Sequence, residues 1–139
     1  MFKIILAFFI SLLFGLIFQV PRNTLIACGV TGALGWIGYS LIITSQPPLL
    51  ATLFSAMIIA ILGEIFARIY KTPVTIFVIV GFIPLVPGLK AYNTILALTN
   101  GEVSTGIELG LQTLFTAGAI AVGISIISSV ARVLKEKAR

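Results

Sequence analysis

The residues with the clearest chemical potential lie in the apolar stretch Gly81–Lys90, which contains two prolines three positions apart. Pro84 and Pro87 have no N–H to donate to the carbonyl four residues earlier, and a proline inside a helix costs about 3 kcal/mol. The preceding residues, Ile83 and Val86, are also expected to leave the α-helical region. The stretch therefore predicts a break between two short helices.

The residues on either side of the prolines extend this break into a candidate binding site. Gly81 and Gly88 permit unusual backbone angles and close approach, so one helix is expected to end near Phe82 and the next to begin near Gly88. Carbonyls freed at such a break accept cations, and the N-terminus of the following half-helix attracts carboxylates. That half-helix adds one cation and two hydrogen-bonding groups, Lys90, Tyr92 and Asn93. We predict substrate binding at Gly81, Pro84, Pro87, Gly88, Lys90, Tyr92 and Asn93; the alternative is a proline kink packed against its neighbours.

A second candidate is the pair Glu64 and Arg68, four residues apart in an apolar segment. Glutamate on the N-terminal side of arginine at this spacing is the favourable order for an ion pair within one helix. A structural pair that neutralises the helix end is the favoured interpretation. A proton-coupling or substrate-relay role is the alternative, because ionisable groups within membranes are often functional.

The elements that carry these residues are those of an integral membrane protein. The chain has 139 residues, of which 59% are hydrophobic and 9% charged, whereas soluble domains carry about 25% charged residues. The longest polar piece is the C-terminal tail, 132–139. We therefore expect an all-α fold with a single transmembrane domain over residues 1–139.

The composition also argues against several function classes. The chain has no histidine and one cysteine, Cys28, so neither a metal site nor another cofactor is expected. The commonest general base is missing as well, and we predict that the protein is not an enzyme. The net charge of +5 is attributed to membrane orientation rather than to nucleic-acid binding.

Five spans are expected from the lengths of the apolar segments, since a bilayer core of about 30 Å needs roughly 20 helical residues. They are Ile4–Val20, Thr24–Thr44, Leu49–Ile69, Val74–Leu98 and Ile107–Val133, with the fourth broken at Pro84 and Pro87. The first has no signal-peptide cleavage site and is read as a retained helix. The fourth crosses the bilayer only if it continues through the prolines, and a re-entrant dip is the alternative.

Charge asymmetry favours the crossing. With five spans and the N-terminus outside, seven basic residues face the cytoplasm, in agreement with the positive-inside rule. They are Arg22, Arg68, Lys71, Arg132, Lys135, Lys137 and Arg139. Lys3, Lys90 and Glu102 then lie on or near the other side. The predicted topology is N-terminus out and C-terminus in.

Glycines recur in two of the predicted spans. Gly29, Gly32, Gly35 and Gly38 follow one another at three-residue spacing, and Gly106 and Gly110 form a Gly-x-x-x-Gly pair. Small residues let helices approach closely in lipid. Both packing within the chain and docking of another subunit explain this pattern.

Three strings of residues resemble the threonine/serine exporter family, in its small-subunit type. They are Pro21-Arg22 followed by the glycines up to Trp36, then Glu64-x-x-Ala-Arg68-x-x-Lys71-x-Pro73, then Ile-Pro-Leu-Val-Pro-Gly at 83–88 followed by Tyr92. The chain is similar to the small subunit of the two-component bacterial succinate exporter. This resemblance implies a larger membrane subunit as partner, with a cytosolic N-terminal domain and spans of its own.

Together these observations predict the small subunit of a two-component secondary exporter in the bacterial inner membrane. The cargo is expected to be a small carboxylate-bearing metabolite, either an amino acid such as threonine or serine or a dicarboxylate such as succinate. The expected partners are the larger subunit, the small-molecule substrate and membrane lipid. The alternatives are a stand-alone homo-oligomeric channel or carrier and a non-transporting assembly factor.

Overall fold

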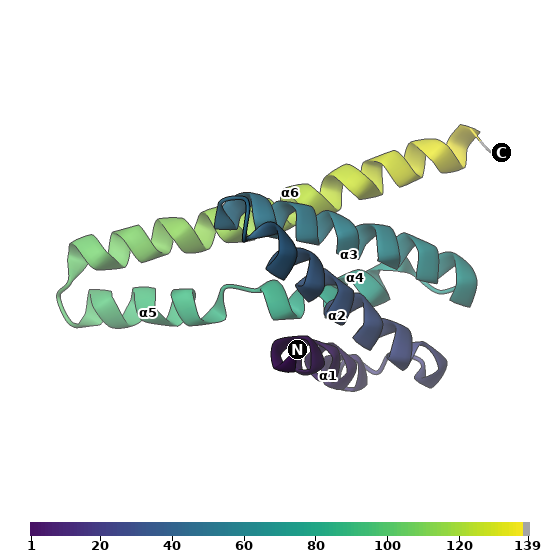
Figure 1. Ribbon diagram of the computed structural model, residues 1–139, viewed down its shortest axis with the longest axis horizontal. Coiled ribbons are helices and arrows are strands. Elements are labelled where there is room, and N and C mark those ends of the chain that lie inside the picture. Colours follow the sequence, from purple (N-terminus) through teal and green to yellow (C-terminus); the bar gives the residue numbers. More distant parts are fainter. Residues whose placement is uncertain (138–139) are drawn as a thin grey trace.

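The chain folds into six α-helices and two short 3₁₀ turns in a computed structural model that describes residues 1–137. The helices are α1 (Phe2–Ile17), α2 (Leu25–Ile42), α3 (Pro48–Tyr70), α4 (Val74–Phe82), α5 (Gly88–Thr99) and α6 (Val103–Lys137), and the turns are η1 (Arg22–Thr24) and η2 (Ile83–Leu85) (Figure 1). No strand occurs in this part of the chain, which confirms the all-α prediction. Arg139, counted above among the cytoplasmic charges, lies outside the described residues.

Three helices are long and apolar enough to cross a membrane: α2 with its preceding turn, α3 and α6. A fourth crossing exists if α4 with η2 and α5 count as one span bent by 52°. The helix α3 has 23 residues, and at 1.5 Å per residue it is about 35 Å long. The structure therefore contains three or four candidate spans, and the fifth expected crossing stays a prediction.

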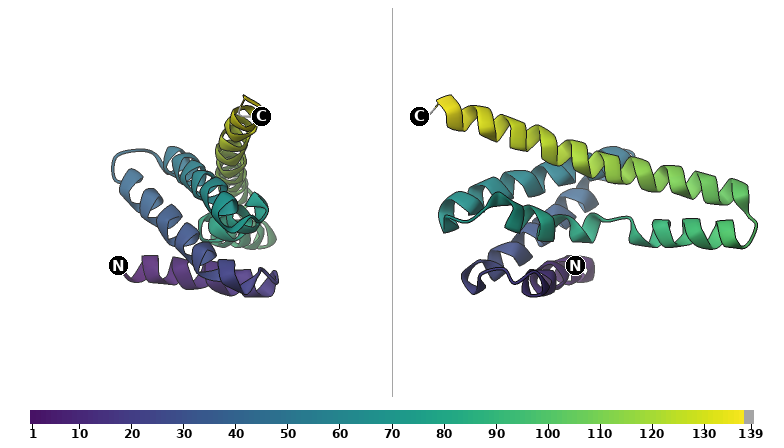
Figure 2. Two further views of the ribbon diagram at one scale, coloured as in Figure 1. Left: turned by 90° about the vertical axis from the view of Figure 1, so that its right-hand side faces the viewer. Right: turned by 180° about the vertical axis from the view of Figure 1, so that it is seen from behind.

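The helix expected as the first span, α1, is shorter than the three candidate spans α2, α3 and α6 and runs across α3 and α6. Its 16 residues give a length of about 24 Å. It is seen nearly end-on in Figure 1 and lengthwise in the left view of Figure 2. By contrast, α3 and α6 run lengthwise in Figure 1 and are foreshortened in the left view of Figure 2. The helix ends at Ile17 because Gln19 adopts a left-handed conformation (φ 55°) and Pro21 follows.

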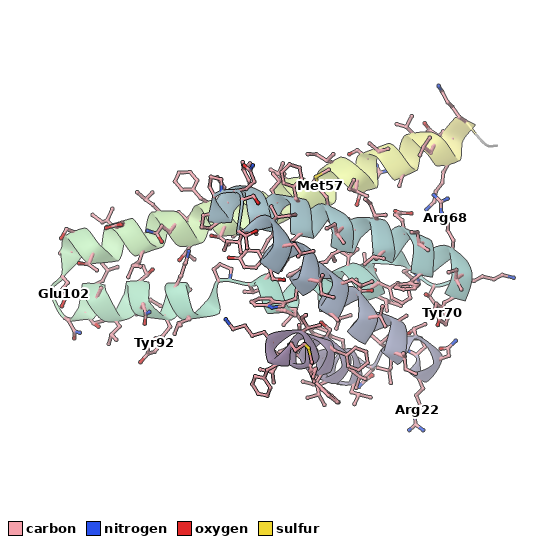
Figure 3. All side chains as sticks on the ribbon, viewed as in Figure 1. Arg22, Met57, Arg68, Tyr70, Tyr92 and Glu102 are labelled. Atoms are coloured by element: carbon pink, nitrogen blue, oxygen red, sulfur yellow. The ribbon has the colours of Figure 1, made fainter. Side chains whose placement is uncertain are left out.

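The helices form a bundle with one protruding hairpin. α2, α3 and α4 pack on one another, and α3 also packs along the C-terminal half of α6. α5 packs on the N-terminal half of α6, and these two segments extend beyond the bundle (Figure 1). We call the opposite end of the molecule the basic end, because Arg22, Arg68 and the C-terminal end of α6 lie there, whereas Tyr92 and Glu102 lie on the hairpin (Figures 1 and 3).

Several glycines lie where two helices of the chain come into close contact, including members of the glycine pattern in α2. A Cβ on Gly32 would meet the side chain of Ser11 on α1, and one on Gly35 would lie 2.5 Å from Ile59 on α3. A Cβ on Gly123 of α6 would lie 2.7 Å from a backbone oxygen of α3. Packing inside the chain therefore explains these glycines.

The helix is interrupted at the two prolines, with the boundaries expected from the sequence. α4 ends at Phe82, η2 follows, and α5 begins at Gly88. Val86 is extended (φ −61°, ψ 129°), as expected before a proline. Ile83 differs from expectation, since it stays in the right-handed helical region (φ −50°, ψ −43°). The reason is that the chain tightens into a 3₁₀ turn there, and Pro84 occupies one of the first positions of that turn, where no N–H is needed.

Candidate functional site

The interruption between α4 and α5 borders a cavity of about 280 Å³, here called the break cavity. Its walls come from α2, α3, the break itself, α5 and α6. The lining residues are Trp36, Tyr39, Pro48, Thr52, Pro84, Leu85, Val86, Pro87, Gly88, Leu89, Lys90 and Thr116. Pro84, Leu85 and Pro87 thus face other parts of the protein, as non-helical backbone at membrane depth requires, whereas Val86 is 48% exposed.

Four of the seven predicted site residues line this cavity: Pro84, Pro87, Gly88 and Lys90. A Cβ at Gly88 would have no neighbouring atom within 4 Å, so the cavity wall is open at this point. Helix α5 begins here without a side-chain cap, with Lys90 in its first turn. An uncapped helix N-terminus beside an ammonium group is suited to a negatively charged ligand.

The other three predicted residues lie elsewhere. Gly81 is buried in α4, where a Cβ would come within 2.7 Å of Thr31 and 2.9 Å of Ile59, so its small size permits close helix packing, and a role in binding stays a prediction. Tyr92 is 62% exposed and extends from α5 on the side away from α6 (Figure 3). Asn93 lies on α5 outside the lining of the break cavity. A role for Tyr92 and Asn93 in binding stays a prediction.

Two aromatic residues of α2 complete the wall of the break cavity. Trp36 and Tyr39 lie with ring centroids 5.5 Å apart, and both line the cavity. Each ring carries one hydrogen-bonding group on an apolar body. The sequence did not place them at the site, because nothing in the pattern of α2 indicates that this face meets the break. Trp36 and Pro84 also line a neighbouring cavity of about 230 Å³ that includes Lys3 of α1.

The second candidate region is a cavity of about 290 Å³ at the basic end, here called the Glu64 cavity. It lies between α3, α4 and α6. The lining residues are Glu64, Val74, Thr75, Val78, Ile124, Ser128, Arg132 and Lys135. One carboxylate, two cations and two hydroxyl groups therefore share a small space.

The partner of Glu64 differs from the expected one. Within residues 1–137, the one salt bridge joins Lys135 Nζ on α6 to Glu64 Oε2 on α3, at 3.3 Å, and replaces the predicted bridge to Arg68. The physical reason is tertiary packing, because α6 runs along α3 and brings Lys135 beside Glu64, whereas Arg68 is exposed at the end of α3. The Glu64 side chain is 13% exposed, and its Oε2 atom has no hydrogen-bond partner in the described part of the chain.

An apolar cluster separates the two cavities. Its buried members are Ala56, Ile59, Leu85 and Ile120, and Trp36, Tyr39, Phe82 and Ile124 pack against them. Along α6, Ile120 lies between Thr116 of the break cavity and Ile124 of the Glu64 cavity. Along α3, the cluster likewise lies between Thr52 and Glu64. The two cavities thus occupy successive levels of one helix bundle.

Residues 3–130 match the family model described as threonine/serine exporter. The chain belongs to the threonine/serine exporter family. Membership, together with the long apolar helices, makes this a membrane protein with multiple spans. The family consists of transporters that export small metabolites across membranes, rather than of enzymes.

Two relatives illustrate how the match is distributed. A threonine/serine exporter from Corynebacterium glutamicum is 28% identical over 117 residues, which cover 84% of this chain and 24% of that protein. A protein of uncharacterised function from Haemophilus influenzae is 27% identical over 122 residues, which cover 81% of this chain and 41% of the relative. The chain therefore spans less than half the length of each of these relatives. No solved structure matches the chain.

Proposed function

We propose that this member of the threonine/serine exporter family is the small subunit of a secondary exporter and that the break cavity holds its substrate. The cargo is a small carboxylate-bearing metabolite, either an amino acid such as threonine or serine or a dicarboxylate such as succinate. The cavity volume of about 280 Å³ is large enough for a solute of this size. Lys90 and the uncapped start of α5 would hold the carboxylate.

The observation that carries this proposal is the direction in which the break faces. Pro84 and Pro87 border a half-open cavity whose walls come from α2, α3, α5 and α6, so this side of the break faces protein. Discontinuous helices that line a cavity are the usual substrate sites of secondary transporters. Trp36 and Tyr39 add apolar walls with one polar group each, as small-molecule sites generally require.

The proposed location is the bacterial inner membrane, with the basic end in the cytoplasm. Arg22, Arg68 and the C-terminal end of α6 lie at that end, and Glu102 lies at the other (Figures 1 and 3). Cytoplasmic loops carry an excess of lysine and arginine, which supports this orientation. In this arrangement α4 and α5 form one broken span, as the predicted topology requires.

We further propose a larger membrane subunit as partner. The two relatives named above carry much more chain than the part that matches this protein. Apolar side chains of the α5–α6 hairpin are also left exposed, such as Leu89 (74%), Ile95 (65%) and Leu114 (69%). Reconstitution in liposomes with and without the companion tests this point, because transport by the chain alone would contradict the two-subunit arrangement.

The break site itself is tested by the double substitution Pro84→Ala, Pro87→Ala. Alanine restores both N–H groups, so α4 and α5 are expected to join into one helix that carries Lys90 out of the cavity. The variant should insert in the membrane at normal levels and lose export. Pro21→Ala, an exposed proline outside both cavities, is the matched control and should export normally. Normal export by the double variant would refute the break site.

A further inference from the structure

The Glu64 cavity has no task in the proposed transport site, although it contains a largely buried carboxylate with two cations at its edge. Glu64 is 13% exposed, and Lys135, its partner, is 57% exposed. Arg132 lines the same cavity and adds a second cation. Thr75 and Ser128 bring hydroxyl groups to the wall, and α4 begins beside them without a side-chain cap. The cavity thus combines a negative group, two positive groups and polar hydrogen-bonding positions.

We propose that the Glu64 cavity is a second solute-binding site, selective for small zwitterions that carry one ammonium and one carboxylate group. The carboxylate would contact Arg132 and Lys135, and the ammonium group would take the place of Lys135 at Glu64. The volume of about 290 Å³ accommodates such a molecule. The Glu64–Lys135 bridge is then the closed state of an empty site. A bound solute breaks this bridge and forms two ion pairs in its place, one between its ammonium group and Glu64 and one between its carboxylate and the two cations.

The placement of Glu64 decides the charge class of the ligand. Its Oε2 has no hydrogen bond within residues 1–137, so one exposed lysine is the principal compensation for a largely buried carboxylate. An ammonium group that the solute brings to Glu64 is therefore favourable, because an incompletely compensated charge in a low-dielectric site attracts its opposite strongly. A dicarboxylate would instead bring its second negative charge toward Glu64, which is unfavourable at such a distance.

The position of the cavity suits loading from the cytoplasm. It lies at the basic end, where α3 and α6 finish and α4 begins, and the apolar cluster around Ile59 and Ile120 separates it from the break cavity. Thr52 and Glu64 are 12 positions apart on α3, so the two cavities are about 18 Å apart along that helix. This inference rests on the proposed exporter function, and it resolves the choice of cargo in favour of amino acids.

The test compares Glu64→Gln with Glu108→Gln, using L-threonine and succinate as probes. Glu108 is a matched control, because it lies on the hairpin outside both cavities and contacts Gln112 at 3.3 Å. Two measurements are made for each variant: apparent affinity in counterflow by cells expressing the complete exporter, and the thermal stabilisation of the purified full-length chain by each probe. Glu64→Gln should weaken L-threonine at least tenfold and leave succinate unchanged or improved, whereas Glu108→Gln should change neither.

A second variant, Lys135→Gln, separates this site from other roles of the ion pair. It removes a carboxylate partner and leaves Glu64, so it should weaken L-threonine, whereas succinate, which the site disfavours, should be unchanged. If Glu64→Gln instead affects both probes equally, the bridge is a structural brace and the proposal fails. If it removes dependence on the proton gradient without changing L-threonine affinity, Glu64 is a proton-coupling group and the proposal also fails. Absence of stabilisation by L-threonine in the unmodified chain likewise overturns it.

The failure of this inference is distinguishable from that of the proposed break site. Normal export by the Pro84→Ala, Pro87→Ala variant removes the break site and leaves the binding result at Glu64 standing. Loss of export in that variant supports the break site, and unchanged selectivity in Glu64→Gln at the same time refutes the second site.

Discussion

The two glycines that flank the break have opposite surroundings, so alanine at each position should have opposite effects. A Cβ on Gly81 would lie 2.7 Å from Thr31 and 2.9 Å from Ile59, both fully buried side chains that have no space to move into. Overpacking of this kind lowers the free energy of unfolding by about 1–3 kcal/mol. Gly88 has no atom within 4 Å of the added carbon and no left-handed backbone angle. There, alanine should raise stability by about 0.4–1 kcal/mol by restricting the unfolded chain.

The effect on substrate binding should be the opposite of the effect on stability: large for Gly88→Ala and small for Gly81→Ala. Gly88→Ala adds a methyl group to the wall of the break cavity, and the misfit of one methyl in a binding pocket is worth about tenfold in specificity. Gly81→Ala should reduce the amount of folded protein in proportion to its lower stability, with little change in the affinity of the folded fraction.

The assay uses the fluorescence of Trp36, the single tryptophan of the chain, which lines the break cavity. Thermal unfolding in detergent gives the melting temperature Tm, which should fall by several degrees for Gly81→Ala and not for Gly88→Ala. Counterflow in cells gives apparent affinity. Equal Tm values for Gly81→Ala and the unmodified chain, or a large stability loss in Gly88→Ala, would show that the packing described here is wrong.

Three further predictions concern other parts of the molecule. Gly123→Ala should destabilise the chain by about 1–3 kcal/mol, because its Cβ would lie 2.7 Å from a backbone oxygen of α3. Gly118→Ala should not, because no atom lies within 4 Å of the added carbon, and thermal unfolding compares the two variants. Lys90→Gln should weaken carboxylate substrates about tenfold in counterflow without lowering Tm; unchanged affinity contradicts its assignment. Glu102→Cys should react with an impermeant maleimide in intact cells, whereas the unmodified chain should not, because Cys28 is fully buried; labelling only after permeabilisation reverses the proposed orientation.

Local chemistry made the boundaries of the break predictable from the sequence. Pro84 and Pro87 remove two N–H groups wherever the chain is placed, so the helix must stop and restart around them. Phe82 and Gly88 are the bounds that the structure has. Ile83 shows the limit of this reasoning, because a 3₁₀ turn accommodates the following proline without moving Ile83 out of the helical region.

Tertiary packing determined what the sequence did not predict. The i, i+4 spacing favoured Arg68 as partner of Glu64, but the choice of Lys135 depends on how α6 lies against α3. Trp36 and Tyr39 reach the break only because α2 crosses the bundle. Tyr92 was expected at the site because it follows the break closely in sequence, yet its position on α5 directs it away from α6.

The unbroken course of α6 has a mechanical consequence. This single 35-residue helix contributes Thr116 to one cavity and Lys135 to the other, and it touches α3 closely at Gly123, between them. If Gly123 acts as a pivot, a 10° tilt of this rigid lever displaces Lys135 by about 3 Å and Thr116 by about 2 Å in the opposite direction. One arm would then swing away from its cavity as the other swings inward, which is the reciprocal motion that alternating access demands.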